Sequence, residues 1–228
     1  MNTQNGNALF LILIAVALLG TLSYAVTNSN RGNISTMTKE RAQLYATEIL
    51  EYSQNISNAV GQLRLRGCME HEISFENPIV TTGYANTSAP LDNSCHVFHP
   101  SGGAISWQTP DNSVIEGTAS AESWRFNANN VITNVGTNAD GAASADLALF
   151  LQDVQQAICI EINNKLSLTN PSGNPPIDQD ATINTAAGFI GNYTDIETIS
   201  DADNALSGKT AGCLTSGQNT FYKVLIAR

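Results

Sequence analysis

Four cysteines and three histidines are the side chains of this sequence best suited to form a disulfide framework or a metal site. The cysteines are Cys68, Cys95, Cys159 and Cys213, and the histidines are His71, His96 and His99. An even number of cysteines in an exported domain is typical of disulfides, and four cysteines allow three pairings. We predict Cys68–Cys95, which would tie a helix to the head of the protein, and Cys159–Cys213, which would hold a long loop region.

A zinc site is the alternative use of the first cysteine pair. Two cysteines and two histidines supply the sulfur and nitrogen ligands of a tetrahedral zinc ion. The set would be Cys68, His71, Cys95 and His99. Their spacing differs from the zinc-finger pattern, so the sequence favours the disulfide.

A calcium loop is the alternative use of the acidic residues near the C-terminus. Asp201 and Asp203 are separated by one residue and offer the oxygen ligands that calcium prefers. The twelve-residue calcium-loop pattern, with its glycine and its terminal glutamate, is absent. A solvated acidic surface is the favoured interpretation, and we predict neither a metal nor a cofactor.

No catalytic signature is present in the sequence. It lacks the Gly-x-Ser-x-Gly elbow, the phosphate-binding Gly-Lys-Ser/Thr loop, the His-Glu-x-x-His motif and the Gly-x-Gly-x-x-Gly motif. The 228 residues carry a formal charge of -10, which is opposite to the basic surface that nucleic-acid binding requires. With 42% hydrophobic and 13% charged residues, the chain is too apolar for global disorder. We expect a folded protein that is not an enzyme and binds no nucleic acid.

The N-terminus carries an apolar segment that can position the rest of the chain at a membrane. Residues 8–26 contain no charged side chain, and as a helix they would span about 28 Å, close to the thickness of a bilayer core. Three interpretations follow: a secretory signal cleaved after residues 23–25, an uncleaved anchor, or a short leader that ends at Gly6. The leader contains no lysine or arginine, unlike the basic region of a secretory signal.

Residues 34–67 have the pattern of an amphipathic helix. Their apolar side chains recur at intervals of three and four residues, which places them on one helix face. These residues are Tyr45, Ile49, Tyr52, Ile56, Ala59, Val60 and Leu63. Gly67 is a typical C-terminal cap, and Arg64 and Arg66 in the last turn suit the helix dipole.

The remaining residues, 68–228, predict a small polar head. Short apolar runs separated by turn residues indicate an antiparallel sheet. The expected strands are 72–75, 78–82, 95–99, 104–108, 123–127 and 131–135, with a closing strand at 221–227. Helical spacing and a cap at Ser144, with Asp146 in the first turn, predict a second helix over 147–166. Residues 169–217 are expected to be loop-rich. The fold class is therefore α+β, with a long helix packed on the head.

With a short leader ending in Gly6, an apolar run and an amphipathic helix below a polar head, the chain resembles type IV pilins and pseudopilins. The resemblance implies cleavage after Gly6, so that Asn7 becomes the mature N-terminus. It also implies a filament core formed by the apolar helix, which here comprises Leu9, Phe10, Leu11, Ile12, Leu13, Ile14, Val16, Leu18 and Leu19. Leu11 occupies the position where most members carry a glutamate, so apolar packing alone would set the register between subunits.

The resemblance divides the chain into a leader (1–6), a transmembrane and filament-core segment with a polar exit (7–33), a spine helix (34–67) and a disulfide-bonded head (68–228). It implies storage in the inner membrane with an exported head, then homo-oligomeric assembly at the cell surface by pilus or secretion machinery. The alternatives are a single-pass envelope protein and an exported adhesin or binding domain, neither of which polymerises.

Overall fold

The computed structural model of the chain describes residues 10, 12–19, 21, 37–80, 82–137, 144–179, 183–185, 188–194, 197–200 and 204–228. The chain forms two units, Met1–Thr38 and Lys39–Arg228. In the first unit, the described residues at 10, 12–19 and 21 are helical and solvent-exposed. Most of the predicted long N-terminal helix lies outside the described residues. Within the described part of the chain, none of the helices combines the length and the apolar character needed to cross a membrane.

Helix α2, Lys39–Leu65, is the longest element of the second unit and confirms a helix within the predicted range 34–67. Every residue of the predicted apolar stripe except Tyr45 is buried, together with Ala42, Ala46 and Ser53. At its end, the amide of Gly67 donates to the carbonyl of Arg64, and the amide of Cys68 donates to that of Leu63. Gly67 has a φ of 102°, which completes a Schellman cap, so the predicted role of this glycine is confirmed.

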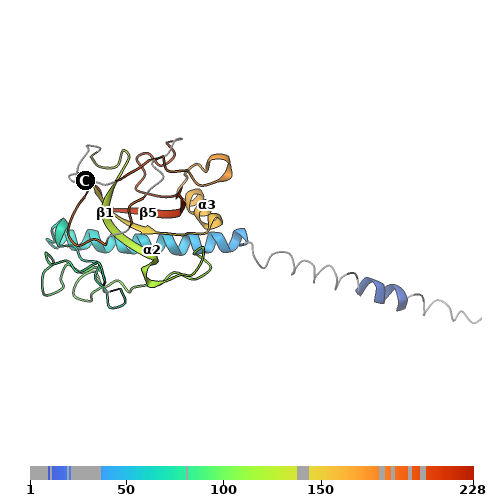
Figure 1. Cartoon of the computed structure of the whole chain (residues 1–228). Helices are drawn as coiled ribbons and strands as arrows, with labels where there is room; N and C mark the ends of the chain where they lie inside the picture. The colour runs from blue at the N-terminus through green and yellow to red at the C-terminus, as the bar shows by residue number, and fades with distance from the viewer. Residues whose placement is uncertain are drawn as a thin grey trace, which may run out of the picture. The chain divides into compact units, whose positions relative to one another are not determined.

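A five-stranded sheet with the order β3-β1-β2-β5-β4 packs beside α2 (Figure 1). The strands are β1 (Trp124–Ile132), β2 (Asp146–Leu151), β3 (Glu197–Ile199), β4 (Ala211–Ser216) and β5 (Gln218–Ile226). The pairs β1–β2, β2–β5 and β4–β5 are antiparallel, whereas β1 and β3 are parallel. The α+β class is thus confirmed, and the predicted antiparallel sheet is corrected to a mixed one. The parallel pair exists because β3 enters from the long region after α3 rather than from a hairpin.

The two edges of the sheet are joined by the segment 176–179, so the sheet curls around a core. The Thr215 amide of β4 donates to the carbonyl of Pro176 over 2.8 Å, and the Gln179 amide donates to the carbonyl of Ser200, next to β3, over 3.1 Å. The enclosed core includes Ile132, Val135, Ala148, Phe150, Leu168, Ile199, Leu206, Leu214, Tyr222 and Val224. Joining both edges satisfies backbone groups that an open sheet would expose.

The opposite side of the sheet contacts α2 and the shorter helix α3, Gln156–Lys165. The rings of Tyr52 on α2 and Trp124 on β1 lie 5.2 Å apart. The two helices also contact each other, and Gln43 donates to the carboxylate of Glu161 over 3.2 Å. The helix α2 is therefore embedded in the folded unit along one face.

The predicted second helix at 147–166 is wrong in its first half, which is β2, and correct in its second half, which is α3. All six residues of β2 are buried, so its apolar run has no solvent-facing side to reveal a period of two. Ser144 and Asp146 do not cap a helix. Asp146 instead accepts hydrogen bonds from the amides of Ile132 and Arg228, each over 3.0 Å.

Other predicted strands differ as well. The described residues of the segments 72–75, 78–82, 95–99 and 104–108 form no strand, and a single bridge joins Ser74 to His96. The 3-10 turn η1 (Glu70–Glu72) leads into the first of them, and η2 (Ala121–Ser123) precedes β1. The expected strands 123–127 and 131–135 merge into β1, and the closing strand is confirmed within β5. The predicted loop region 169–217 contains η3 (Pro171–Gly173), β3 and all of β4. These strand-like segments remain loops because they share only isolated backbone hydrogen bonds, such as those of Ser74 with Cys95 and Val97, rather than a continuous ladder.

Asp146 provides a test of stability against pH. Burial raises the pKa of its carboxyl group, and the amides of Ile132 and Arg228 oppose that rise. Because the folded-state pKa lies above the unfolded one, the contribution of Asp146 to stability is complete below the unfolded pKa. It is lost as the pH rises through the folded pKa. We expect the difference in unfolding free energy between wild type and Asp146→Asn to shrink as the pH rises above about 4, the ordinary pKa of an aspartate.

Urea unfolding of both proteins at each pH measures this difference. Asp92 serves as the internal contrast, because hydrogen bonds from Ser94 lower the pKa of its exposed carboxyl group. Comparing wild type with Asp92→Asn should therefore give the opposite slope. A difference for Asp146 that grows with pH would show that its hydrogen bonds outweigh its burial.

Candidate functional site

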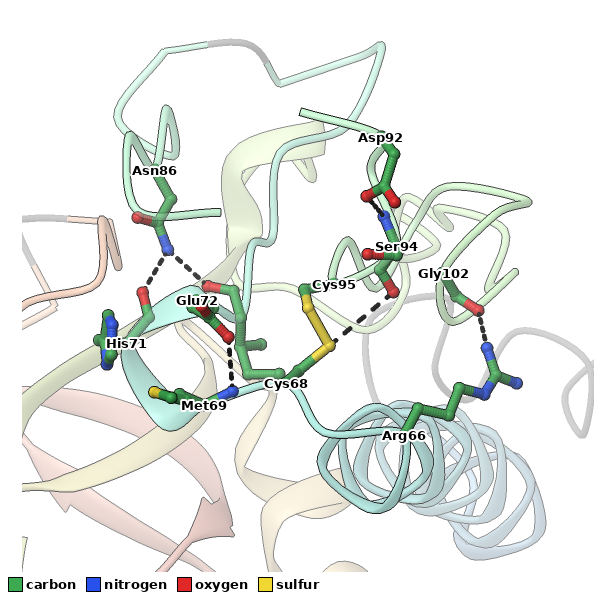
Figure 2. The surroundings of a disulfide bond; sticks show 11 residues. Arg66, Cys68, Met69, His71, Glu72, Asn86, Asp92, Ser94, Cys95 and Gly102 are labelled. Atoms are coloured by element: carbon green, nitrogen blue, oxygen red, sulfur yellow. Dashed lines mark hydrogen bonds between the residues drawn. A yellow bond between two sulfur atoms is a disulfide. The ribbon is translucent and has the colours of Figure 1, made fainter. Parts of the chain in front are cut away.

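The first of the two predicted disulfides lies at the C-terminal end of α2. Cys68, directly after the helix cap, forms a disulfide with Cys95, and their Cα atoms lie 5.8 Å apart (Figure 2). Arg66 donates to the carbonyl of Gly102 over 2.9 Å, and the Met69 amide donates to the carboxylate of Glu72 over 2.7 Å. The disulfide and these bonds fix the end of α2 to the loops that follow it.

The second disulfide joins Cys159 of α3 to Cys213 of β4, with Cα atoms 5.3 Å apart. Both predicted pairings are therefore present, and none of the four cysteines is free. The side chain of Asn163 lies beside this bond. It accepts from the amide of Cys213 over 2.9 Å and donates to its carbonyl over 2.8 Å. The side-chain amide of Asn163 thus pairs with the outer edge of β4 in the way that the backbone of a neighbouring strand would.

The proposed zinc ligands do not form a metal site, because the sulfurs of Cys68 and Cys95 are bonded to each other. The carbonyl of His71 accepts from the Asn86 side chain over 2.8 Å, and Nδ1 of His99 accepts from a backbone amide. No cluster of three metal-binding side chains occurs in the described ranges. Asp201 and Asp203, the calcium alternative, lie outside the described residues.

A shallow groove of about 990 Å³ lies beside the disulfide at the end of α2. It is lined by Ser57, Asn58, Gly61, Gln62, Arg64, Leu65, Gly67, Cys68, Met69 and Glu70. Leu65 is 90% exposed and Met69 is 60% exposed. We call this feature the helix-end groove. It combines apolar side chains with a surface that no other described part of the second unit covers.

The rim of the helix-end groove carries Arg64 and Glu70, and Arg228 pairs with Glu70 beside them, so that the three side-chain charges sum to one positive charge. The carboxylate of Glu70 forms ion pairs with Arg64 over 2.9 Å and with Arg228 over 3.3 Å. The guanidinium of Arg228 also lies 4.0 Å from the ring centre of Tyr193. Burial raises the pKa of this tyrosine, so the phenol stays neutral. The net positive charge of these side chains suits an acidic neighbour.

Gly61 is the unusual residue of the helix-end groove. A Cβ atom at this position would meet no atom of the described residues within 4 Å, so their packing does not require glycine there. We expect Gly61→Ala to raise the free energy of unfolding by about 1 kcal/mol, because alanine has the higher helix propensity. Chemical unfolding followed by tryptophan fluorescence measures the change.

Gly67→Ala is the matched control for this substitution. Gly67 has a φ of 102°, so alanine there should lower the unfolding free energy by about 1 kcal/mol. A loss of stability in Gly61→Ala as well would show that Gly61 is needed within the chain itself.

The sequence patterns did not reveal the groove or Asn163. The available signals were a glycine inside a helical pattern, at Gly61, and an apolar side chain off the stripe, at Leu65. Neither signal states which surface stays open in the folded unit. Comparisons of the chain with protein-family models, with curated proteins and with solved structures gave no match.

Proposed function

We propose that the protein is a non-enzymatic structural subunit of a type IV pilus-like or pseudopilus-like filament. Its apolar N-terminal segment holds it in the inner membrane, with the head exported, until cleavage after Gly6 allows assembly at the cell surface. The observation that carries the proposal is a helical segment with exposed large apolar side chains. These are Phe10, Ile12, Leu13, Ile14, Val16, Leu18 and Leu19.

The physical reason is that such a surface needs an apolar environment. Lipid chains and a bundle of identical helices are both apolar, so one helix surface suits storage in a membrane and packing in a filament core. The proposed core also includes Leu9 and Leu11, which lie outside the described residues, as do Gly6 and Asn7.

The firm attachment of α2 to the rest of the second unit supports the proposal. One face of α2 is buried along its length, its last turn has a Schellman cap, and the Cys68–Cys95 disulfide follows directly. A load applied along α2 would therefore pass into the sheet through many contacts. This suits a subunit whose helix is fixed in a polymer while its head faces solvent.

N-terminal sequencing of the mature chain tests the proposed processing. With a prepilin peptidase and the assembly proteins of a type IV system co-expressed, we expect a mature chain that begins at Asn7. Without the peptidase, we expect Met1. The same membrane fractions should release filaments that contain the chain only in the first case, as judged by electron microscopy.

Two results would contradict the proposal and identify the alternatives. A chain that begins at Val26 would be an exported adhesin or binding domain whose apolar segment is a cleaved signal. A chain that keeps Met1 in the presence of the peptidase, and forms no filament, would be a single-pass envelope protein.

A further inference from the structure

The helix-end groove lacks an occupant within the described second unit, and its composition points to a helix of a second copy. Glycine inside a helix is unfavourable relative to alanine, and Gly61 gains no compensating contact from the described residues. Glycine at the surface of a helix allows another backbone to approach closely. The exposed side chains of Leu65 and Met69 would provide the apolar contact for it.

A second surface of α2 has the complementary chemistry. Leu44 is 58% exposed, and Glu48 and Glu51 follow it on the same exposed side of the helix. Neither glutamate forms an ion pair with any described residue. The helix-end groove, in contrast, has a rim of net positive charge formed by Arg64, Glu70 and Arg228. An apolar side chain flanked by free acids therefore matches an apolar groove flanked by arginines.

The two surfaces lie on different faces of one helix. Leu44 and Gly61 are 17 residues apart, which corresponds to about 25 Å along the axis and about 100° around it. If α2 of a second copy lies parallel and is shifted by this distance, its Leu44 is level with Gly61. Its Glu48 is then level with Leu65, one residue from Arg64. The same shift along the helix axis therefore places Leu44 at the apolar groove and Glu48 near Arg64.

A two-fold symmetric contact through the groove alone would not satisfy these charges. It would bring Arg64 of both copies to one interface, with Glu70 already shared with Arg228, and would leave Glu48 and Glu51 outside it. A contact between two different surfaces is heterologous, and repeating it produces an open polymer rather than a closed dimer.

We propose that the helix-end groove of one copy receives Leu44 and Glu48 of the next copy, with the two α2 helices parallel. This inference rests on the proposed filament function and specifies a contact between neighbouring subunits outside the apolar core. It assigns Gly61 to close helix approach and Glu48 to an ion pair with Arg64 of the neighbour.

Disulfide cross-linking of the full-length chain in its membrane and filament fractions tests the contact. The variant carries Leu44→Cys and Gly61→Cys, and the native cysteines remain paired. Mild oxidation should give a ladder of dimers, trimers and longer products on a non-reducing gel. Each single substitution alone should give no dimer, because the contact joins two different surfaces. The matched control combines Gly61→Cys with Leu91→Cys, since Leu91 is fully exposed and belongs to neither of the two proposed contact surfaces.

A charge exchange tests the ion pair in the cross-linking background. Glu48→Arg or Arg64→Glu alone should lower the yield of the ladder at least about fivefold, and the two together should restore it to within about twofold. Restoration distinguishes a contact between copies from a loss of the Arg64–Glu70 pair within one copy, which the double variant leaves broken.

The outcomes separate this inference from the proposed function. Filaments of chains that begin at Asn7 without a Leu44–Gly61 product would overturn the contact and leave the filament function standing. Dimers from Gly61→Cys alone, or an equal yield with the Leu91 control, would also overturn it. A ladder in chains that retain Met1 and form no filaments would support the contact and contradict the filament function.

Discussion

Loss of the Cys159–Cys213 disulfide is expected to lower the free energy of unfolding by about 4 kcal/mol. The two cysteines are separated by 54 residues, and a cross-link over a loop of this length removes a large conformational entropy from the unfolded chain. Because domains of this size are stabilised by only about 5–15 kcal/mol in total, the change should be visible as a large shift of the unfolding midpoint.

The measurement is urea unfolding of the full-length chain in detergent, with the buried Trp124 as the fluorescent probe. Cys159→Ala with Cys213→Ala is compared with Cys68→Ala with Cys95→Ala. The second pair spans 27 residues, so its removal should cost about 3.5 kcal/mol. If removing the 159–213 bond costs less than about 1 kcal/mol, the packing of α3 on β4 holds this region without the cross-link.

Asn163→Ala is expected to lower the free energy of unfolding by about 3 kcal/mol. The side chain of Asn163 is fully buried and is bonded to both the amide and the carbonyl of Cys213, and it also donates to Asn170 over 2.9 Å. Alanine would leave two buried backbone groups without partners, and each such group costs about 1–3 kcal/mol.

Asn164→Ala is the matched control, because Asn164 is the adjacent residue of the same helix but is exposed. Its side chain accepts a hydrogen bond from the side chain of Asn170 over 3.0 Å at the surface, so we expect a loss below about 0.5 kcal/mol. Similar losses for the two variants would show that helix propensity, rather than the edge of β4, explains the effect.

The two effects should also be coupled. Asn163 and the Cys159–Cys213 disulfide both act on Cys213, so a double-mutant cycle should show a combined loss that differs from the sum of the separate losses. Strict additivity would mean that the hydrogen bonds and the disulfide hold β4 independently of each other.

The end of α2 combines two functions in one short stretch of chain. Gly67 and Cys68 fix the helix to the folded unit, while Gly61, Leu65 and Arg64 form the proposed contact with a neighbour. A contact placed beside a disulfide is held in a constant geometry, because the backbone around it cannot fray. This placement favours a rigid joint between subunits over a flexible one.

Local patterns were sufficient to predict α2, its cap and the disulfide-rich character of the head. A helix with one buried face repeats its apolar residues every three to four positions, and Gly67 is a local requirement of the cap. The pairing of the cysteines was predicted from the role that each bond would have between two elements. The closing strand was recognised because its apolar run ends the chain after a turn.

Contacts between distant residues produced the features that the patterns missed. All of residues 147–151 are buried, so both faces of the strand are apolar and their run resembled the start of a helix. Segments 72–75 and 95–99 have strand-like composition, but a strand forms only where a partner supplies hydrogen bonds, and here the partner is a single bridge. Whether Leu65 is exposed or Asn163 is buried depends on elements far away in the chain. Helix periodicity is a property of neighbouring residues, whereas strand pairing, burial and open grooves are properties of the assembled fold.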